Sequence, residues 1–204
     1  MSNYIEEKLK HFREPFVITE DGSSQTRLSN HGRVGFFFER IFGILPNNDR
    51  RPDLGSWELK TLQPGKKVSI GTMPESEFNA IKRADKHLFE DSDPYRKMKN
   101  TLFIMYSNLG GYPDVQYQMD GWGLMDLSAM SDQVKNVLQE DYEFICRYIS
   151  EHCNTRDAVT DLLMTRGAVS GDYLSLSYKG QGSYGYNYPA WNFQAKFMKM
   201  ITHA

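Results

Sequence analysis

The sequence predicts a mixed α/β (α+β) fold with a small central sheet flanked by helices. Residues 132–152 repeat apolar side chains at helical spacing, over the longest such stretch of the chain. Residues 101–107, "TLFIMYS", form a short continuous apolar run, which is typical of a buried strand. A chain of 204 residues can bury a substantial core, so we expect one domain over residues 1–204.

The first half of the chain supplies two helices and two strands ahead of the buried run. We expect helices over residues 3–12 and 32–45, because apolar side chains recur there on one helical face. Strands are expected over residues 56–62 and 67–72. The turn "PG" between them predicts that these two strands form a hairpin.

The second half closes with one strand and one helix around a loop. After the long helix at 132–152, residues 173–179 alternate as a half-buried strand. Residues 180–189, "GQGSYGYNYP", have the composition of a loop. Residues 192–201 then predict a closing helix.

Composition is that of an ordinary globular protein, with 40% hydrophobic and 25% charged residues. The formal net charge of −2 does not indicate a polyanion binder overall, although a local basic patch remains compatible with it. No run of about 18 apolar residues predicts a membrane span, and the N-terminus does not resemble a signal peptide. Cys146 and Cys153 are expected to be free thiols in a reducing, cytoplasmic setting.

The stretch "RPDLGSWELKTLQP" places several charged side chains at the start of a strand. Glu58 and Lys60 alternate with Leu59, so we expect them side by side on the outward face. Asp53 lies just before the strand. Two converging carboxylates can hold Mg²⁺, and the backbone carbonyl of Leu59 is a plausible third ligand. The alternative is a solvated ion pair with a nearby acid.

Four blocks in the same order resemble the MutH family and its related GATC-cutting restriction enzymes, within the P-D-(D/E)-x-K nucleases. The blocks are "GRVGFFFE" at 32–39, "PDLGSWELKT" at 52–61, "YRKMKNTLF" at 95–103 and "YPAWNFQAKFM" at 188–198. The resemblance implies a restriction-endonuclease-like core, with a catalytic part at about 30–107 and a DNA-reading part at about 165–204.

Carried over by position, the resemblance assigns five catalytic residues. Asp53 and Glu58 match the metal-binding acids, and Lys60 matches the signature lysine. Glu39 matches a glutamate on a helix beside the metal site, and Lys97 matches a supporting lysine from a neighbouring segment. Without the resemblance, Glu39 reads equally well as a solvated helix residue, and Lys97 as part of a basic surface that meets phosphates.

Three departures from the family pattern affect these assignments. The gap between Asp53 and Glu58 is shorter, which leaves Asp49 as a competitor for Asp53. Ser177 replaces an arginine and Asn192 replaces a tyrosine, at positions that help to read GATC in the family. The departures therefore weaken the expectation of GATC specificity and leave the nuclease core intact.

The resemblance places the segment from Ser177 to Asn192 at the position of the family's DNA reader, and its donors and acceptors could bond base edges in the major groove. The alternative is a surface loop without a binding role. Phosphate contacts are expected from Arg96 and Lys99. The full set of expected DNA-binding residues is Tyr178, Lys179, Gln181, Tyr184, Tyr186, Asn187, Asn192, Arg96 and Lys99.

The sequence therefore predicts a Mg²⁺-dependent, sequence-specific DNA endonuclease of the type II restriction class, acting on double-stranded DNA. One alternative is a mismatch-repair enzyme that nicks one strand and needs a MutL-like activator. Another is a DNA-binding module that does not cleave, which the set of Asp53, Glu58 and Lys60 disfavours. Because one catalytic core cuts one strand at a time, double-strand cleavage would require a homodimer, a second subunit or two sequential nicks.

Overall fold

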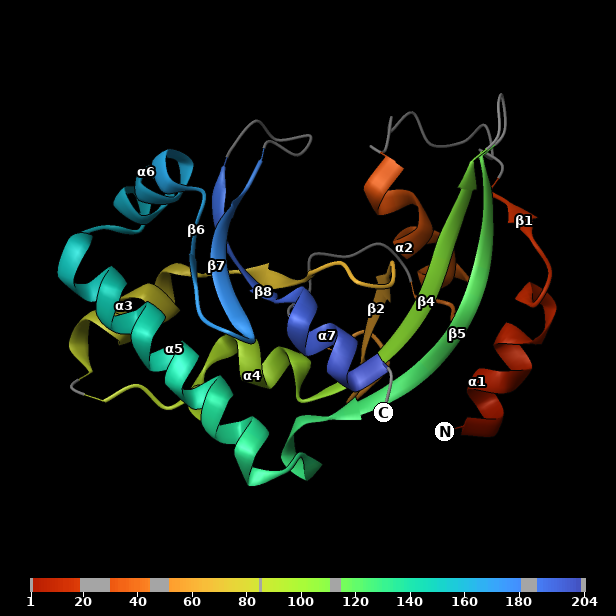
Figure 1. Cartoon of the computed structure of the whole chain (residues 1–204), viewed down its shortest axis with the longest axis horizontal. Helices are drawn as coiled ribbons and strands as arrows, with labels where there is room; N and C mark the ends of the chain where they lie inside the picture. Colours follow the sequence, from red (N-terminus) through yellow and green to blue (C-terminus); the bar gives the residue numbers. More distant parts are fainter. Residues whose placement is uncertain are drawn as a thin grey trace. The chain divides into compact units, whose positions relative to one another are not determined.

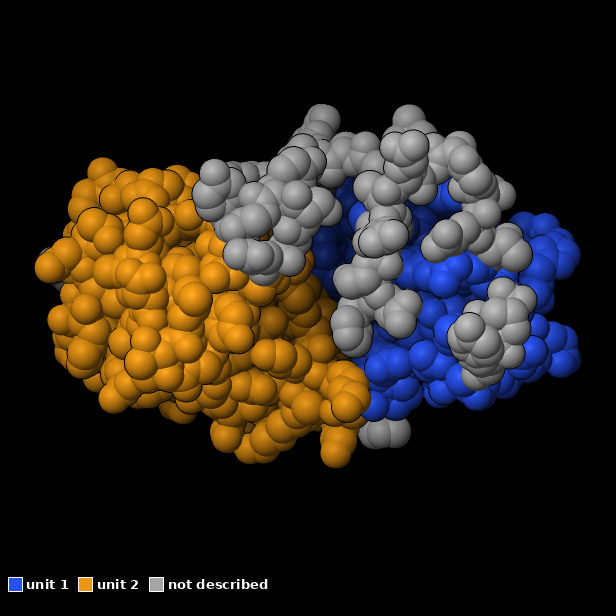
Figure 2. All heavy atoms as spheres, turned by 90° about the horizontal axis from the view of Figure 1, so that it is seen from above, with its two compact units in different colours: residues 1–64, 101–125 blue, residues 65–100, 126–204 orange. Residues whose placement is uncertain are grey.

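The computed structural model describes residues 2–18, 30–44, 52–84, 86–110, 115–180 and 187–202. The expected Asp49, Gln181, Tyr184 and Tyr186 lie outside these residues. Among the helices of the described ranges, none has both the length and the apolar character that crossing a membrane requires. The chain divides into two compact units, which Figure 2 colours separately. The first unit holds residues 1–64 and 101–125, and the second holds residues 65–100 and 126–204.

Helices and strands are interspersed along the chain (Figure 1). The helices are α1 (Ser2–Leu9), α2 (Asn30–Ile41), α3 (Glu75–Arg83), α4 (Asp93–Met98), α5 (Asp132–His152), α6 (Arg156–Arg166) and α7 (Ala195–Thr202), with short 3₁₀ turns η1 (Lys10–Phe12), η2 (Phe89–Asp91) and η3 (Leu127–Ala129). The strands are β1 (Phe16–Val17), β2 (Glu58–Leu62), β3 (Val68–Thr72), β4 (Asn100–Gly110), β5 (Gln116–Asp126), β6 (Ala168–Ser170), β7 (Leu174–Lys179) and β8 (Tyr188–Phe193).

The sheet of the first unit has the strand order β1-β5-β4-β2. Strand β2 pairs in parallel with β4, with Glu58 opposite Thr101 and Leu62 opposite Met105. It stands at the end of the strand order, so β4 is its one partner strand in this sheet. An apolar core that includes Val34, Phe38 and Leu102 anchors α2 to the sheet.

The sheet of the second unit is antiparallel throughout, in the order β3-β8-β7-β6. Residues that stand opposite each other in the register lie on the same face of the sheet. One face carries apolar side chains such as Ile70, Leu176 and Trp191, which are buried. Trp191 packs on this side against Tyr142 of α5, with 5.2 Å between ring centroids. The long helix therefore covers the apolar face of this sheet.

The mixed class is confirmed, and the helix expected at 132–152 has those bounds in α5. The expected hairpin of residues 56–62 and 67–72 is wrong, because the chain turns at Pro64-Gly65 but the strands enter different sheets. The single small sheet is likewise replaced by two. The closing helix begins at Ala195, and Asn192 belongs to strand β8. Helix α6 and strands β1, β5, β6 and β8 were not predicted.

Candidate active site

Asp53 lies beside strand β2 and is bonded to its backbone. A tight turn with Leu54 and Trp57 bridged and Gly55 at φ +72° folds the segment back toward the strand. As a result, Asp53 Oδ2 accepts a hydrogen bond from the Leu59 backbone N–H at 3.1 Å. In a strand, the N–H and C=O of one residue point toward the same edge. The Leu59 carbonyl is therefore directed to the edge on which the Asp53 carboxylate lies.

Glu58 and Lys60 form an ion pair on one face of β2, as their spacing predicts. Lys60 Nζ donates to Glu58 Oε1 at 2.6 Å. The expectation that this face is an outer one is wrong for Glu58, whose side chain is 3% exposed against 22% for Lys60. A buried carboxylate is costly unless it is paired and hydrogen-bonded. The lysine is therefore both a candidate catalytic group and the partner that makes the burial of Glu58 tolerable.

Glu39 reaches the same site from helix α2. A close approach of α2 to β2 brings it there, because a Cβ placed on Gly35 would lie 3.6 Å from Thr61 Oγ1. Burial raises the pKa of the Glu39 carboxyl above its ordinary value, as does the negative charge of Asp53. Lys60 lowers this pKa and Glu58 raises it. Four of the five expected catalytic residues thus interact within one unit.

The donor set of this site suits a hard divalent cation with few protein ligands. No group of three or more His, Cys, Asp or Glu side chains among the described residues is arranged to enclose a metal ion. A Mg²⁺ ion does not need one, since it commonly keeps several waters and binds through one or two carboxylates. Asp53, Glu58 and the Leu59 carbonyl, the ligands that the sequence predicts, would offer such a smaller set of oxygen atoms, and their role as ligands stays a prediction.

Lys97, Arg96 and Lys99 belong to the second unit, on or just after α4. The Lys97 side chain runs along Gly71 of β3, where an added Cβ would lie 3.5 Å from Lys97 Cδ. Arg96 pairs with Asp93 on its own helix and donates to the Asp91 carbonyl. The catalytic role of Lys97 and the phosphate contacts of the other two stay predictions.

Of the expected DNA-reading residues that the structure describes, Tyr178 and Lys179 lie on β7, Asn192 lies on β8, and Asn187 directly precedes β8. Tyr178 is 42% exposed and Lys179 is exposed beside it. Asn187 Nδ2 lies 3.2 Å from Met164 Sδ of α6. Asn192 is 5% exposed, and its amide donates to Ser177 Oγ at 3.0 Å and to the Ala190 carbonyl. The two positions that depart from the family pattern therefore contact each other inside the fold.

Two buried carboxylates, Glu77 and Asp141, were not singled out from the sequence. Asp141 accepts hydrogen bonds from the backbone N–H groups of Asp172, Tyr173 and Leu174. The sequence could have indicated Asp141, because an aspartate on the apolar face of the helix at 132–152 needs buried hydrogen-bond partners. Glu77 gave no such signal, since its partners come from distant segments. Both lie in the second unit and outside the cluster around Asp53.

Comparisons with known proteins bear on the family and the fold of the chain. The model of the MvaI/BcnI restriction endonuclease family matches residues 10–112, half of the chain. The fold is similar to the solved complex of the restriction endonuclease MvaI with its cognate DNA substrate, at a TM-score of 0.51 and 11% identity. That similarity covers 97% of this chain and 94% of the other. No curated protein sequence matches the chain.

The family match spans Glu39, Asp53, Glu58, Lys60 and Lys97. It supports a type II restriction endonuclease, whereas the finer resemblance to MutH stays a prediction. The chain belongs to the MvaI/BcnI restriction endonuclease family, and so it is a deoxyribonuclease of the restriction type.

Proposed function

We propose that this endonuclease hydrolyses double-stranded DNA with Mg²⁺ held by Asp53, Glu58 and the Leu59 carbonyl. Members of restriction endonuclease families generally use a divalent metal ion. The observation that carries the proposal is the hydrogen bond from Leu59 N–H to Asp53 Oδ2. It keeps the carboxylate on the edge of β2 to which the Leu59 carbonyl points.

The chemistry of the site divides between metal and protein. When bound, a divalent cation lowers the pKa of a coordinated water and offsets the charge that develops on a phosphate. We assign Lys60, whose ammonium group donates to Glu58, the role of orienting the attacking water or of donating to a phosphate oxygen. Glu39 adds a third carboxylate, whose pKa is raised by burial first and then by the negative charge of Asp53. We assign Lys97, which lies in the second unit, a supporting role in cleavage.

Double-stranded DNA is the proposed partner. The similar solved structure is a complex with DNA, and the strand pair β7–β8 carries Lys179 on an exposed end. The segment from Ser177 to Asn192 is proposed to read sequence, with Lys179 as the leading base contact. A lysine that bonds O6 and N7 of guanine discriminates by about 1–3 kcal/mol.

A plasmid assay tests this function. Purified protein with Mg²⁺ should convert supercoiled plasmid to linear DNA, and sequencing of the ends would give the recognition site. Chelator should stop the reaction. A product that is nicked and never linear would favour the MutH-like alternative, in which a MutL-like partner activates nicking. Untouched plasmid across a range of sequences would support a DNA-binding module without cleavage.

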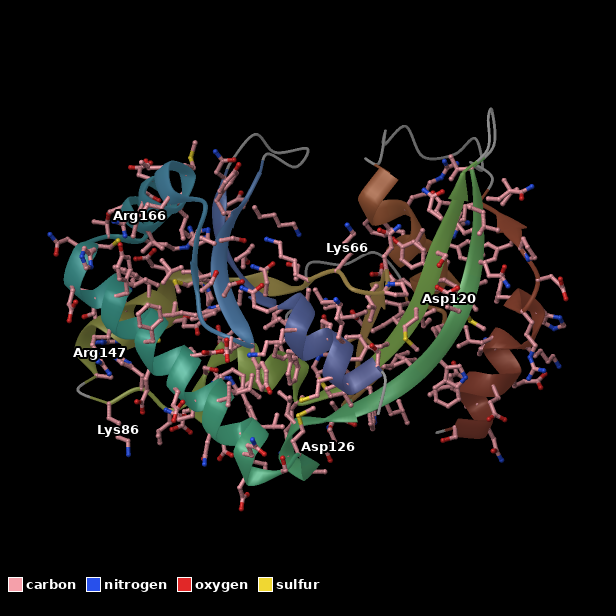
Figure 3. All side chains as sticks on the ribbon, viewed as in Figure 1. Lys66, Lys86, Asp120, Asp126, Arg147 and Arg166 are labelled. Carbon is pink, nitrogen blue, oxygen red and sulfur yellow. The ribbon has the colours of Figure 1, made fainter. Side chains whose placement is uncertain are left out.

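A matched pair of variants tests the metal ligands. Asp53→Asn should abolish cleavage while DNA binding is retained, because one ligand charge is lost from the metal site. Asp120→Asn is the control, since Asp120 is an exposed acid on β5 of the same unit, bonded to Ser107 Oγ at 2.7 Å (Figure 3). Equal activity of the two variants would refute the assignment of Asp53.

A further inference from the structure

We propose that Arg156, the first residue of helix α6, binds a DNA backbone phosphate beside the strand pair β7–β8. The proposal rests on the DNA binding proposed above. No residue of α6 is among the DNA-binding residues that the sequence predicts.

Arg156 is held in place by two contacts within the second unit. Its Nε donates to the Met73 carbonyl at 2.8 Å, and its Cζ lies 5.5 Å from the ring centroid of Tyr188. Met73 in turn donates from its backbone N–H to the Pro189 carbonyl at 2.8 Å. The guanidinium is therefore tied to the ends of β3 and β8.

These contacts leave the terminal fork of the guanidinium for another ligand. Within the part of the chain that the structure describes, no hydrogen bond or ion pair engages Nη1 or Nη2 of Arg156. The two amino groups of a guanidinium fit the two oxygens of a phosphate, and such paired bonds are among the stronger ones in proteins. A fork that is already oriented loses less side-chain entropy when it binds.

The position of Arg156 connects it to the proposed reader. Tyr188, whose ring Arg156 contacts, stands directly opposite Lys179 in the register of β7 and β8. A phosphate suits Arg156 better than a base edge does, because the Nε bond to Met73 shortens the reach of the side chain. Phosphate and sugar also receive about half to two-thirds of the hydrogen bonds in protein–DNA complexes.

Salt-dependent binding is the test. A labelled DNA duplex of mixed sequence would be titrated with protein in the presence of chelator, which prevents cleavage, and followed by fluorescence anisotropy. Between about 50 and 200 mM KCl, each phosphate contact contributes about 0.9 to the slope of log affinity against log salt. Arg156→Gln should bind more weakly at low salt and lose about that much slope.

Two further variants separate a local contact from a general charge effect. Arg147→Gln removes the same charge from an exposed position on α5 of the same unit (Figure 3) and should leave the slope unchanged. Tyr188→Leu keeps the charge of Arg156 and its bond to Met73 but removes the ring. It should lose part of the affinity, whereas Tyr188→Phe should retain it. Thermal melting would establish that each variant is folded.

The outcomes are distinguishable. The proposal is overturned if Arg156→Gln binds like the wild type, or no differently from Arg147→Gln. It is also overturned if Arg156→Gln discriminates less between sequences at an unchanged salt slope, which would make Arg156 a base contact. If the wild-type protein binds no duplex at all, the proposed DNA binding fails together with this inference.

Discussion

The carboxylate of Asp141 lies against the backbone of Gly171 so closely that no other residue type fits there. A Cβ on Gly171 would overlap Oδ1 of Asp141 and lie 2.8 Å from its Cβ. The approach lets Asp141 accept three consecutive backbone N–H groups in the turn that leads into β7. A helix residue thereby fixes the start of the strand that carries Lys179.

Substitution at either position should destabilise the second unit. Asp141→Asn presents an amide N–H to backbone donors, and leaving buried donors unsatisfied costs about 1–3 kcal/mol. Gly171→Ala should lower the free energy of unfolding more than Gly167→Ala does, because its new Cβ would overlap Asp141. Nothing lies within 4 Å of a Cβ at Gly167, so the cost there comes from its φ of +90°. Chemical denaturation would measure the three variants, and an unaffected Gly171→Ala would contradict the described contact.

Glu77 should make stability fall as pH rises. Burial, and then the charge of Asp93, raise the pKa of Glu77 from 4.5 to about 8 in the folded protein. The unfolded chain therefore releases this proton near its ordinary pKa, while the folded chain keeps it until about pH 8. Between these values the folded state binds more protons, so each pH unit costs up to about 1.4 kcal/mol.

The variant Glu77→Gln should remove this part of the pH dependence. In the wild type, the Tyr142 hydroxyl and the Trp191 indole N–H each donate to one carboxyl oxygen of Glu77. In the variant, the amide oxygen can accept from the indole N–H, and the amide N–H can donate to the hydroxyl oxygen of Tyr142. Urea unfolding at pH 5 and pH 8 would show a smaller loss of stability in this variant than in wild type. Glu75→Gln, on the exposed side of the same helix, is the control and should keep the wild-type dependence. Identical behaviour of both variants would disprove the role of Glu77.

The two lysines of the proposed mechanism should respond differently to removal. Lys60→Ala should lower the cleavage rate by orders of magnitude with little loss of DNA affinity, because its role lies in the transition state. Lys97→Ala should be milder. Lys60→Ala also leaves Glu58 buried without its ion pair, so Lys60→Arg provides a variant that keeps the charge. If both alanine variants lose mainly affinity, the lysines are phosphate contacts.

Lys179→Ala should relax sequence specificity. If Lys179 bonds a base, the variant should cut altered sites at rates close to that of the original site, with little change in salt dependence. Lys86→Ala, at an exposed position of the same unit (Figure 3), should leave specificity intact. Uniformly weaker binding of every sequence, with a shallower salt slope, would assign Lys179 to the DNA backbone.

Local patterns predicted most of what depends on neighbours in the chain. The bounds of α5 follow from its apolar seam, and the Glu58–Lys60 pair follows from strand alternation. Asp53 and Leu59 are also close in sequence, which is why their shared edge of β2 could be expected. Each of these features requires a few residues to adopt one regular conformation.

Local sequence patterns could not predict how segments far apart in the chain pair with each other. A turn at Pro64-Gly65 is compatible with a hairpin, and only the preference of β2 for β4 and of β3 for β8 excludes it. The burial of Glu58 depends on packing that no local pattern encodes. Tyr188 and Arg156 likewise meet only because β8 and α6 share a unit.

The parallel pairing of β2 with β4 also has a kinetic consequence. The chain leaves the first unit at Pro64 and returns to it at Thr101. Strand β2, which carries Glu58 and Lys60, can therefore pair with β4 only after the intervening segment has been synthesised. Closing such a loop lowers the entropy of the chain before the favourable contacts between the strands can form, and pairing of distant segments therefore slows folding. During synthesis on the ribosome, a nascent chain that ends before β4 has emerged cannot complete this sheet. The candidate active site is therefore not completed before β4, near the middle of the chain, has been synthesised.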